Sequence, residues 1–192
     1  MIDSAAFVKR LNRTKPVPVK LSSALMDGLR INRFEAQETF ISPGNYPSSL
    51  YYIESGLVRG AIEGETEKMT TWFKQEGDII IPQGLFNQQP SEEYISAVAA
   101  KTTLLSLPYS HIQKVLESFP EAKELFILLV AETTKTAQYR EKLLRIPAAK
   151  DRYAFLSKHE DFILKRIPHY LIASYLNVTK ETFSRLHKGL DY

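Results

Sequence analysis

The sequence predicts an α+β protein in three parts, which are an antiparallel β-barrel or sandwich, a long helix and a C-terminal helix-turn-helix. Three observations predict this fold. Between about residues 34 and 107, short apolar or alternating runs are separated by glycine turns, a pattern typical of all-β barrels and sandwiches. From about residue 120 to 145, apolar residues recur at spacings of three and four, which is the period of a helix. Residues 166–189 contain two short helical segments joined by turn residues.

The N-terminal part begins with a loosely apolar helical region over residues 4–30, broken by Pro16 and Pro18. Six runs that follow it are predicted to be strands: Leu50–Ile53, Leu57–Ile62, Thr70–Phe73, Ile79–Ile81, Tyr94–Val98 and Leu104–Leu107. Strands and helices do not alternate, so a doubly wound nucleotide-binding fold is not expected.

The long predicted helix carries two neighbouring apolar seams. The first is formed by Ala122, Leu125, Leu129, Glu132, Thr136, Tyr139, Leu143 and Ile146, and the second by Phe126, Val130, Thr133, Ala137 and Leu144. One face would cover the barrel and the other would meet the same helix of a second copy. Glu132 and Thr136 would interrupt the apolar seam. The alternative is a single wide core face within one monomer.

The C-terminal segment has the signals of two helices and a tight turn. Pro168 suits a first helical position, and Asn177 tolerates the left-handed conformation that a sharp turn requires. Thr179 is a good N-cap for the second helix, on which Phe183 and Leu186 face inward. The residues left to face outward are Lys180, Glu181, Ser184, Arg185 and Lys188. This arrangement predicts a helix-turn-helix, whose second helix enters the major groove of DNA.

The charge is divided unevenly along the chain. Residues 140–192 contain eleven Lys and Arg and six Asp and Glu, a net charge of +5, whereas residues 1–139 have a net charge of −2. A basic C-terminal part on an acidic body suits a polyanionic partner, double-stranded DNA in this case. The alternative is a helical hairpin that only packs on the rest of the chain.

The composition excludes several other classes of protein. There is no cysteine, which excludes disulfides, Cys-ligated zinc and Cys-ligated iron–sulfur clusters. No apolar run is long enough to span a membrane, and the N-terminus lacks the order of regions found in signal peptides. We therefore expect a cytoplasmic protein with no membrane partner.

Along essentially its whole length the chain resembles the Crp/Fnr family of bacterial transcription regulators, most closely the type found in Bacteroidetes-like bacteria, and four segments carry this resemblance. The segments are Tyr51–Arg59, Glu76–Asp78, Ala149–Leu156 and Ile172–Leu186. The last contains the specific pattern Ala-Ser-x-Leu-x-x-Thr-x-Glu-Thr-x-Ser-Arg. The resemblance implies a cyclic-nucleotide-binding-like β-roll (a jelly roll) over residues 1–119, a dimerisation helix over 120–146 and a DNA-binding helix-turn-helix domain over 147–192. It also implies a homodimer and RNA polymerase as a partner.

Carried over by position, Lys180, Glu181 and Arg185 match the base-reading residues of the family. Arg can bind the O6 and N7 atoms of guanine, and a carboxylate can accept from the N4 of cytosine. Thr179 and Ser184 would hold phosphates or bases, and Lys188 and His187 would be better placed for backbone contact. Glu181 has an alternative role, which is to lie favourably at a helix N-terminus. Because the sequence stops at Tyr192, we expect a helix-turn-helix domain that lacks a wing.

The sequence departs from the members of the family that bind cyclic AMP. Those members have Gly-Glu at the start of a phosphate-binding cassette and Arg-Ser/Thr-Ala at its end. Here Asp78 replaces the Glu, and Tyr94 or Ile95 occupies the position of the Arg. A cyclic phosphate normally requires a guanidinium, so we expect no control by cyclic AMP. The expected pocket for another small-molecule effector comprises Asp78, Phe86, Asn87, Tyr94, Thr133 and Thr136.

Metal and enzymatic sites are not expected. The four histidines, His111, His159, His169 and His187, all lie outside residues 31–107, so neither a haem ligand nor a cupin-like metal cluster is predicted in the barrel. The sequence also lacks a catalytic constellation, so we expect no enzyme and no cofactor. Two alternatives to a DNA-binding regulator remain. One is a small-molecule-binding barrel with a helical tail that does not read DNA, and the other is a family member that acts only through protein contacts.

Overall fold

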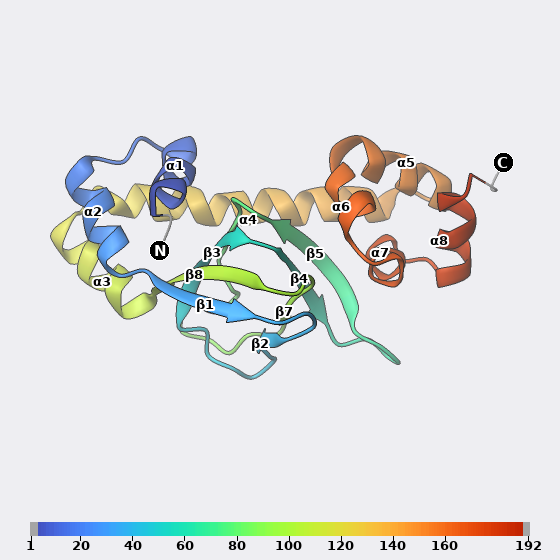
Figure 1. Ribbon diagram of the computed structural model, residues 1–192, viewed down its shortest axis with the longest axis horizontal. Coiled ribbons are helices and arrows are strands. Elements are labelled where there is room, and N and C mark those ends of the chain that lie inside the picture. Colours follow the sequence, from blue (N-terminus) through green and yellow to red (C-terminus); the bar gives the residue numbers. More distant parts are fainter. Residues whose placement is uncertain (1–3, 190–192) are drawn as a thin grey trace. The chain divides into compact units, whose positions relative to one another are not determined.

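The computed structural model describes residues 4–189 (Figure 1). Within this range the chain forms two compact units. The first contains residues up to 59 together with residues 74–134, and the second contains residues 60–73 together with residues from 135 onward. The second unit therefore includes a segment from the middle of the β-rich region, with parts of two strands.

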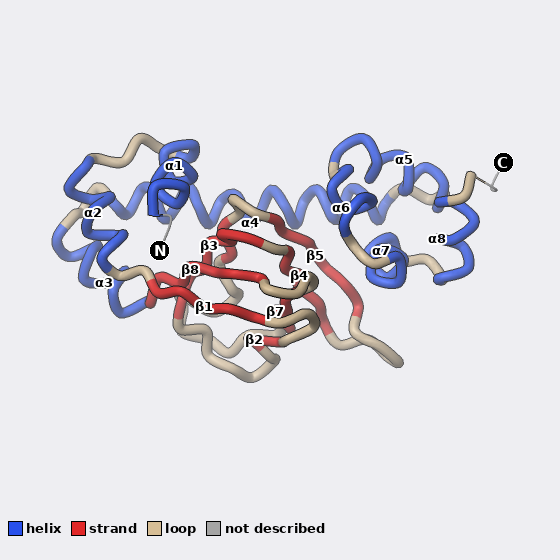
Figure 2. Tube along the Cα trace, viewed as in Figure 1, coloured by secondary structure: helices blue, strands red, loops and turns tan. Residues whose placement is uncertain are grey.

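The first unit combines helices with most of the strands of two antiparallel sheets (Figure 2). Its helices are α1 (Ser4–Thr14), α2 (Val19–Asp27), α3 (Tyr109–Ser118) and the first part of α4 (Ala122–Arg145). The break between α1 and α2 contains Pro16 and Pro18, as predicted. Proline lacks the N–H that a continuing helix would need at these positions.

The two sheets have four strands each. One has the order β1-β8-β3-β6, with β1 at Arg30–Phe34, β8 at Thr102–Pro108, β3 at Ser49–Ser55 and β6 at Ile79–Ile80. The other has the order β2-β7-β4-β5, with β2 at Thr39–Ile41, β7 at Tyr94–Ala97, β4 at Leu57–Ile62 and β5 at Met69–Gln75. In the first sheet β3 and β8 pair antiparallel, with Leu50 opposite Leu107 and Tyr52 opposite Leu105.

The side chains of β3 alternate between two apolar regions. Leu50 and Tyr52 belong to the core formed with the helices, in which Phe7 of α1 packs edge-on against Tyr52 with ring centroids 5.7 Å apart. Ile53 is also fully buried but is not part of that helical core. Because strand residues alternate in direction, one strand supports both regions. Burial of each large apolar side chain contributes about 1.5–3 kcal/mol to stability.

The glycine at the β3–β4 turn has a structural reason. Gly56 has a φ of +100°, and a Cβ atom there would lie 2.4 Å from Oγ1 of Thr102. Both the backbone conformation and the space therefore require glycine. This is the Ser55–Gly56 turn signal of the sequence.

All six predicted strands are observed, but two further strands, β1 and β2, were missed. β1 has the polar sequence Arg-Ile-Asn-Arg-Phe and lies at the edge of its sheet, with no buried residue. β2 has only three residues and also lies at an edge. Neither strand has the apolar alternation that identifies a half-buried strand.

The helix predicted over about residues 120–145 is observed as α4. Ala122, Leu125, Leu129 and Leu143 of the first seam are buried. The division into two seams was partly wrong, because Phe126 of the second seam is also buried, whereas Ile127, which belongs to neither seam, is 66% exposed. Val130 and Leu144 of the second seam are exposed, as expected for a face that the monomer does not cover.

The second unit contains the last part of α4 and four shorter helices. These are α5 (Ala149–His159), α6 (Asp161–Arg166), α7 (His169–Leu176) and α8 (Lys180–His187). The inserted residues 60–73 carry their own packing, since a Cβ atom on Gly60 would lie 2.1 Å from the ring of Trp72. Phe73 is buried, and its ring lies 5.3 Å from that of Tyr175 on α7.

Candidate nucleic-acid interface

Helices α7 and α8 are joined by a turn of three residues, Asn177 to Thr179. Asn177 adopts the left-handed conformation, with φ 52° and ψ 55°, which asparagine tolerates better than most residues with a Cβ atom. The N–H of Val178 donates to the carbonyl of Ala173 at 3.0 Å, which satisfies the end of α7. Oγ1 of Thr179 accepts from the N–H of Thr182 at 3.1 Å, so Thr179 is the N-cap of α8. The predictions for Asn177 and Thr179 are therefore observed.

The prediction for Pro168 was wrong by one position. Pro168 is the N-cap of α7, with an extended ψ of 136°, and His169 is the first helical residue. A cap residue needs non-helical torsion angles, and the fixed φ of proline is compatible with them.

The two helices pack through apolar side chains. Ile172, Ala173 and Leu176 of α7 are fully buried or nearly so, as are Phe183 and Leu186 of α8. These are the inward-facing residues that the sequence predicts. Their burial fixes which side of α8 is left accessible.

Six of the residues predicted to contact DNA lie on α8 and at its two ends. Five of them, Thr179, Lys180, Glu181, Arg185 and Lys188, are exposed, and Ser184 is half-buried. Residues three or four apart share a helical face, so this set forms one polar surface. Glu181 lies in the first turn, where its carboxylate also interacts favourably with the helix dipole.

One residue of this surface has an acidic neighbour within the same unit. Nζ of Lys180 lies 3.9 Å from Oε2 of Glu67, in the loop between β4 and β5, and both side chains are more than half exposed. Exposed ion pairs contribute about 0–1 kcal/mol. The pair therefore competes only weakly with a stronger anion for Lys180.

Arg152 supports the turn between α7 and α8, a role that the sequence did not reveal. Its Nη1 donates to the carbonyls of Ile146 and Pro147 at 2.9 and 3.0 Å. Its Nη2 reaches the carbonyl of Asn177 at 3.5 Å. The guanidinium thus connects the segment after α4 to the turn that orients α8.

Residues 60–73 hold α7 from another side. The N–H of Thr70 donates to Oγ of Ser174 at 2.9 Å, and the carbonyl of Thr70 accepts from Nη2 of Arg140 at 3.2 Å. The Arg140 guanidinium lies 4.3 Å from the centroid of the Tyr175 ring, a cation–π contact. Burial lowers the pKa of Arg140. Burial, together with the Glu160 carboxylate, raises the pKa of Tyr175, whose hydroxyl donates to Glu160 at 3.1 Å.

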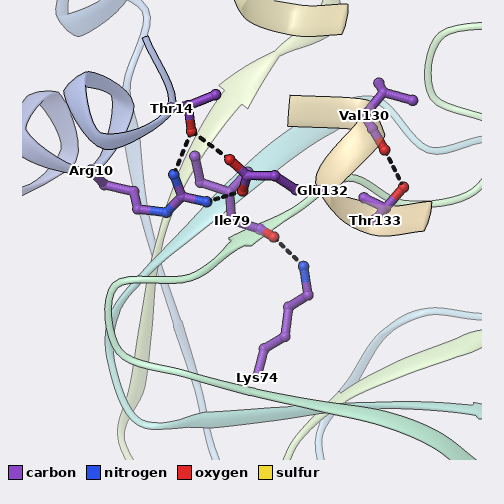
Figure 3. Close-up of polar contacts among 7 residues, drawn as sticks. All are labelled: Arg10, Thr14, Lys74, Ile79, Val130, Glu132 and Thr133. Carbon is purple, nitrogen blue, oxygen red and sulfur yellow. Dashed lines mark hydrogen bonds and ion pairs between the residues drawn. The ribbon is translucent and has the colours of Figure 1, made fainter. Parts of the chain in front are cut away.

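A polar cluster in the first unit connects α1 to α4 (Figure 3). Arg10 forms an ion pair with Glu132, and its Nη1 donates to Oγ1 of Thr14 at 2.8 Å. The Thr14 hydroxyl in turn donates to Oε1 of Glu132 at 2.6 Å. Glu132, which interrupts the apolar seam of α4, is therefore satisfied by two side chains of α1.

Lys74 is a second cation of this unit that the sequence analysis overlooked. Its Nζ donates to the carbonyl of Ile79 (Figure 3). Burial lowers the pKa of Lys74, and the nearby carboxylate of Asp78 opposes this shift. Lys74 and Arg10 lie in no motif of the sequence, so no pattern pointed to either of them.

The six residues of the expected effector pocket have varied surroundings. Asp78 accepts from the N–H of Gln75 at 2.9 Å, Thr133 donates to the carbonyl of Val130 at 2.7 Å, and Phe86 packs on Tyr109 and Phe126 with centroids 6.0 Å apart. Asn87 is exposed and Tyr94 is half-buried, while Thr136 belongs to the second unit. Asp78, Phe86 and Thr133 therefore already contact other groups of the first unit.

A cavity of about 420 Å³ lies elsewhere in the first unit and was not predicted. Its lining consists of Phe40, Ile41, Gly44, Asn45, Tyr46, Pro47, Ser48 and Tyr51. It includes none of the six expected pocket residues. Burial raises the pKa of the Tyr51 phenol, so this hydroxyl stays protonated at neutral pH. The Pro-Gly turn at residues 43–44 is the only local signal that points to this region.

The remaining sequence expectations concern metals and membranes. Among residues 4–189, no group of three or more His, Asp or Glu side chains is arranged to hold a metal ion. No helix in this range combines the length and the apolar character that a membrane span requires. His111 is half-buried, since its Nε2 lies 2.7 Å from the carbonyl of Ala24 and its ring fills the space beside Gly28.

Part of the chain matches a known domain family in sequence, and most of the chain resembles solved structures in fold. Residues 31–119 match the family described as the cyclic nucleotide-binding domain, while no curated protein matches the chain. The structure is similar to that of CLP, the c-di-GMP-responsive global regulator of Xanthomonas campestris, with a TM-score of 0.71 and 17% identity over 90% of this chain and 91% of that one. FixK2 of Bradyrhizobium japonicum gives a TM-score of 0.69 with 19% identity over 84% of each chain.

A third similar structure, from Eubacterium rectale, is assigned to the crp/fnr family of transcriptional regulators. It gives a TM-score of 0.68 with 15% identity over 88% of this chain and 82% of that one. At these identities the likeness concerns the fold alone. Residues 31–119 thus match a cyclic nucleotide-binding domain, and the chain has the fold of Crp/Fnr regulators.

Proposed function

We propose that the protein is a transcription regulator that binds DNA sequence-specifically as a homodimer and has no enzymatic activity. The observation that carries this proposal is α8. A left-handed turn and a threonine cap set its start, its apolar side is buried, and its other side carries the polar surface of Lys180, Glu181 and Arg185. A helix of this kind at the end of a tight turn is suited to enter a major groove.

The side chains of α8 suit different parts of a DNA site. Arg185 would bind guanine through its two forked N–H groups, and Glu181 would accept from cytosine N4. Lys180 would complete the base contacts, while Thr179 and Ser184 would reach phosphates or bases. Lys188, at the end of α8, would contact the backbone and set affinity rather than sequence.

A second copy would cover the exposed apolar side of α4. Ile127 is 66% exposed, Val130 39% and Leu144 41%, although the opposite side of the same helix is buried. Two-fold pairing through this helix would bury both copies of each side chain and place two recognition helices on a pseudo-palindromic site. In this proposal residues 1–119 form an effector-type domain, 120–146 form the dimer and 147–192 bind DNA. RNA polymerase is a further partner by resemblance.

We propose an effector other than cyclic AMP, or none. Tyr94 and Ile95 occupy the position where a phosphate-binding guanidinium is expected. Two cations of the first unit are already engaged: Arg10 contacts Glu132 and Thr14, and Lys74 contacts the carbonyl of Ile79. A phosphate would have to break these contacts. Calorimetry with cyclic AMP is expected to give no heat of binding, and a micromolar dissociation constant would contradict this part of the proposal.

The DNA-binding proposal is tested by two substitutions on one helix. A site is first obtained by selection from random DNA, and affinities are then measured over a range of salt concentrations. Arg185→Ala should cost about 1–3 kcal/mol and relax one base position. Lys188→Ala should weaken binding to all DNA sequences similarly. It should also reduce the slope of log affinity against log salt concentration by about 1. Lys158→Ala, an exposed cation on α5, is the matched control. An unchanged affinity for Arg185→Ala would refute the assignment of the reading residue.

A further inference from the structure

Two histidines that are eighteen residues apart in sequence meet at the surface of the second unit. His169 is the first residue of α7 and His187 is the last residue of α8. Their ring centroids lie 4.5 Å apart at an interplanar angle of 60°. Both residues are exposed. Two accessible imidazoles at this distance could bind one metal ion together.

Neighbouring aromatic side chains hold both rings in place. The buried ring of Phe183 lies 5.2 Å from His169 and 5.6 Å from His187, so it forms a common wall behind the pair. The hydroxyl of Tyr153 lies 3.1 Å from Nδ1 of His187. When Nδ1–H donates to this oxygen, Nε2 keeps its lone pair. Histidines that bind metals almost always have such a hydrogen bond on their other nitrogen, because it fixes the tautomer and the ring orientation.

The separation of the rings corresponds to a particular coordination angle. With a metal–nitrogen distance of about 2.05 Å and a ring nitrogen about 1.15 Å from its centroid, each centroid lies about 3.2 Å from a shared metal ion. Centroids 4.5 Å apart then subtend about 90° at the metal. A tetrahedral angle would require a separation of about 5.2 Å. With one nitrogen of each ring directed at a shared ion, this spacing fits neighbouring positions of a tetragonal or octahedral ion better than a tetrahedral one.

We propose that His169 and His187 form a surface chelate for a transition-metal ion of the copper(II) or nickel(II) type, with water completing the coordination. Imidazole suits these metals, and both favour tetragonal geometry with neighbouring ligands at 90°. The pair supplies two protein ligands, fewer than the three or more His, Asp or Glu side chains of a complete metal site. A bound ion would link the first residue of α7 to the last residue of α8. The inference does not rest on DNA binding.

The test is a titration of the full-length protein with copper(II), followed by calorimetry and electron paramagnetic resonance. We expect one ion per chain and a spectrum with nitrogen hyperfine structure from two imidazoles. His169→Gln and His187→Gln should each weaken binding at least tenfold, and Tyr153→Phe should weaken it about tenfold through loss of the orienting hydrogen bond. His159→Gln is the matched control, because His159 is also exposed in this unit but stacks on Phe155 at 4.3 Å.

The outcomes separate a chelate from unspecific binding. Loss of affinity in both variants of the pair, with the His159 variant unchanged, supports the proposal. Equal affinity in all variants, or a spectrum with a single nitrogen ligand, overturns it. Thermal unfolding in the presence of a chelator verifies that the variants are folded. His169→Gln and His187→Gln, which change exposed residues, should leave the unfolding temperature unchanged. Tighter binding of zinc than of copper would contradict the assignment of a copper(II)- or nickel(II)-type ion.

Discussion

The proposed dimer predicts that Ile127→Ser weakens self-association strongly without affecting the monomer. Ile127 lies on α4, is 66% exposed and does not belong to the core formed with the helices. Isoleucine and serine have similar helix propensities. The substitution should therefore leave α4 intact and act only on the face that a second copy would cover.

The magnitude follows from the exposed area of this side chain. Complete burial of an isoleucine contributes about 1.5–3 kcal/mol, so covering the exposed two-thirds of Ile127 contributes about 1–2 kcal/mol per chain. In a two-fold dimer the side chain is covered twice. Its loss should weaken dimerisation by about 2–4 kcal/mol, or about 30- to 900-fold in the dissociation constant.

Sedimentation equilibrium over a range of protein concentrations measures this constant directly. Val19→Ser is the matched control, because Val19 is an apolar residue of α2 that is 81% exposed and lies outside α4. The control should dimerise like the wild-type protein. Equal dissociation constants for Ile127→Ser and the wild type, or a wild-type protein that stays monomeric at tens of micromolar, would refute pairing through this face.

Three further predictions concern the cap of α8, the acidic neighbour of Lys180 and the buried Lys74. Thr179→Ala removes the N-cap hydrogen bond and should lower the free energy of unfolding by about 1 kcal/mol in urea denaturation. Glu67→Gln removes the carboxylate that lies 3.9 Å from Lys180, so DNA affinity should rise, by at most about fivefold for an exposed pair. Burial lowers the pKa of Lys74 in the folded protein, so between that pKa and about 10.5 the unfolded chain binds more protons than the folded one. Lys74 therefore makes the free energy of unfolding rise with pH over this window, and Lys74→Met should reduce the rise.

Each of these three predictions has its own control. Thr179→Ser keeps the hydroxyl and should retain most of the stability, and an equal loss in both variants would contradict the cap. Glu65→Gln changes the same loop by one charge, and an equal gain in DNA affinity would show a general charge effect instead of the pair with Lys180. Lys20→Met removes an exposed lysine of α2. If it changes the pH slope of stability as much as Lys74→Met does, the effect is not due to burial.

The turn between α7 and α8 could be predicted because its causes are local. Asn177 tolerates a left-handed backbone, and Thr179 caps the next helix through a hydrogen bond to a residue three positions later. The spacing of Phe183 and Leu186 then determines which side of α8 is buried. None of these features depends on a distant part of the chain.

The polar cluster of the first unit could not be predicted in the same way. Arg10 and Glu132 are 122 residues apart in sequence, and no local pattern connects them. The carbonyl of Ile79 that accepts from Lys74 is a backbone group, which any residue could provide. Such pairings depend on how the sheets and helices pack together, and a local sequence pattern does not predict this packing.

The two faces of α4 could be predicted only in part. Regular spacing predicted the helix and most of its buried side, but the 3,4 pattern continues around the helix through Phe126 and Ile127. Packing against Phe86 decides that Phe126 belongs to the core. Periodicity alone could not separate a wide buried face from a second, uncovered one.

The most direct test of DNA reading by paired α8 helices is a selection of bound sequences from random double-stranded DNA with the wild-type protein. The account predicts two inverted half-sites about 10 base pairs apart, centre to centre. A parallel selection with Arg185→Ala should lose one base position in each half-site and keep the spacing. Recovery of no preferred sequence by the wild type, or of identical sequences by both proteins, would contradict the account.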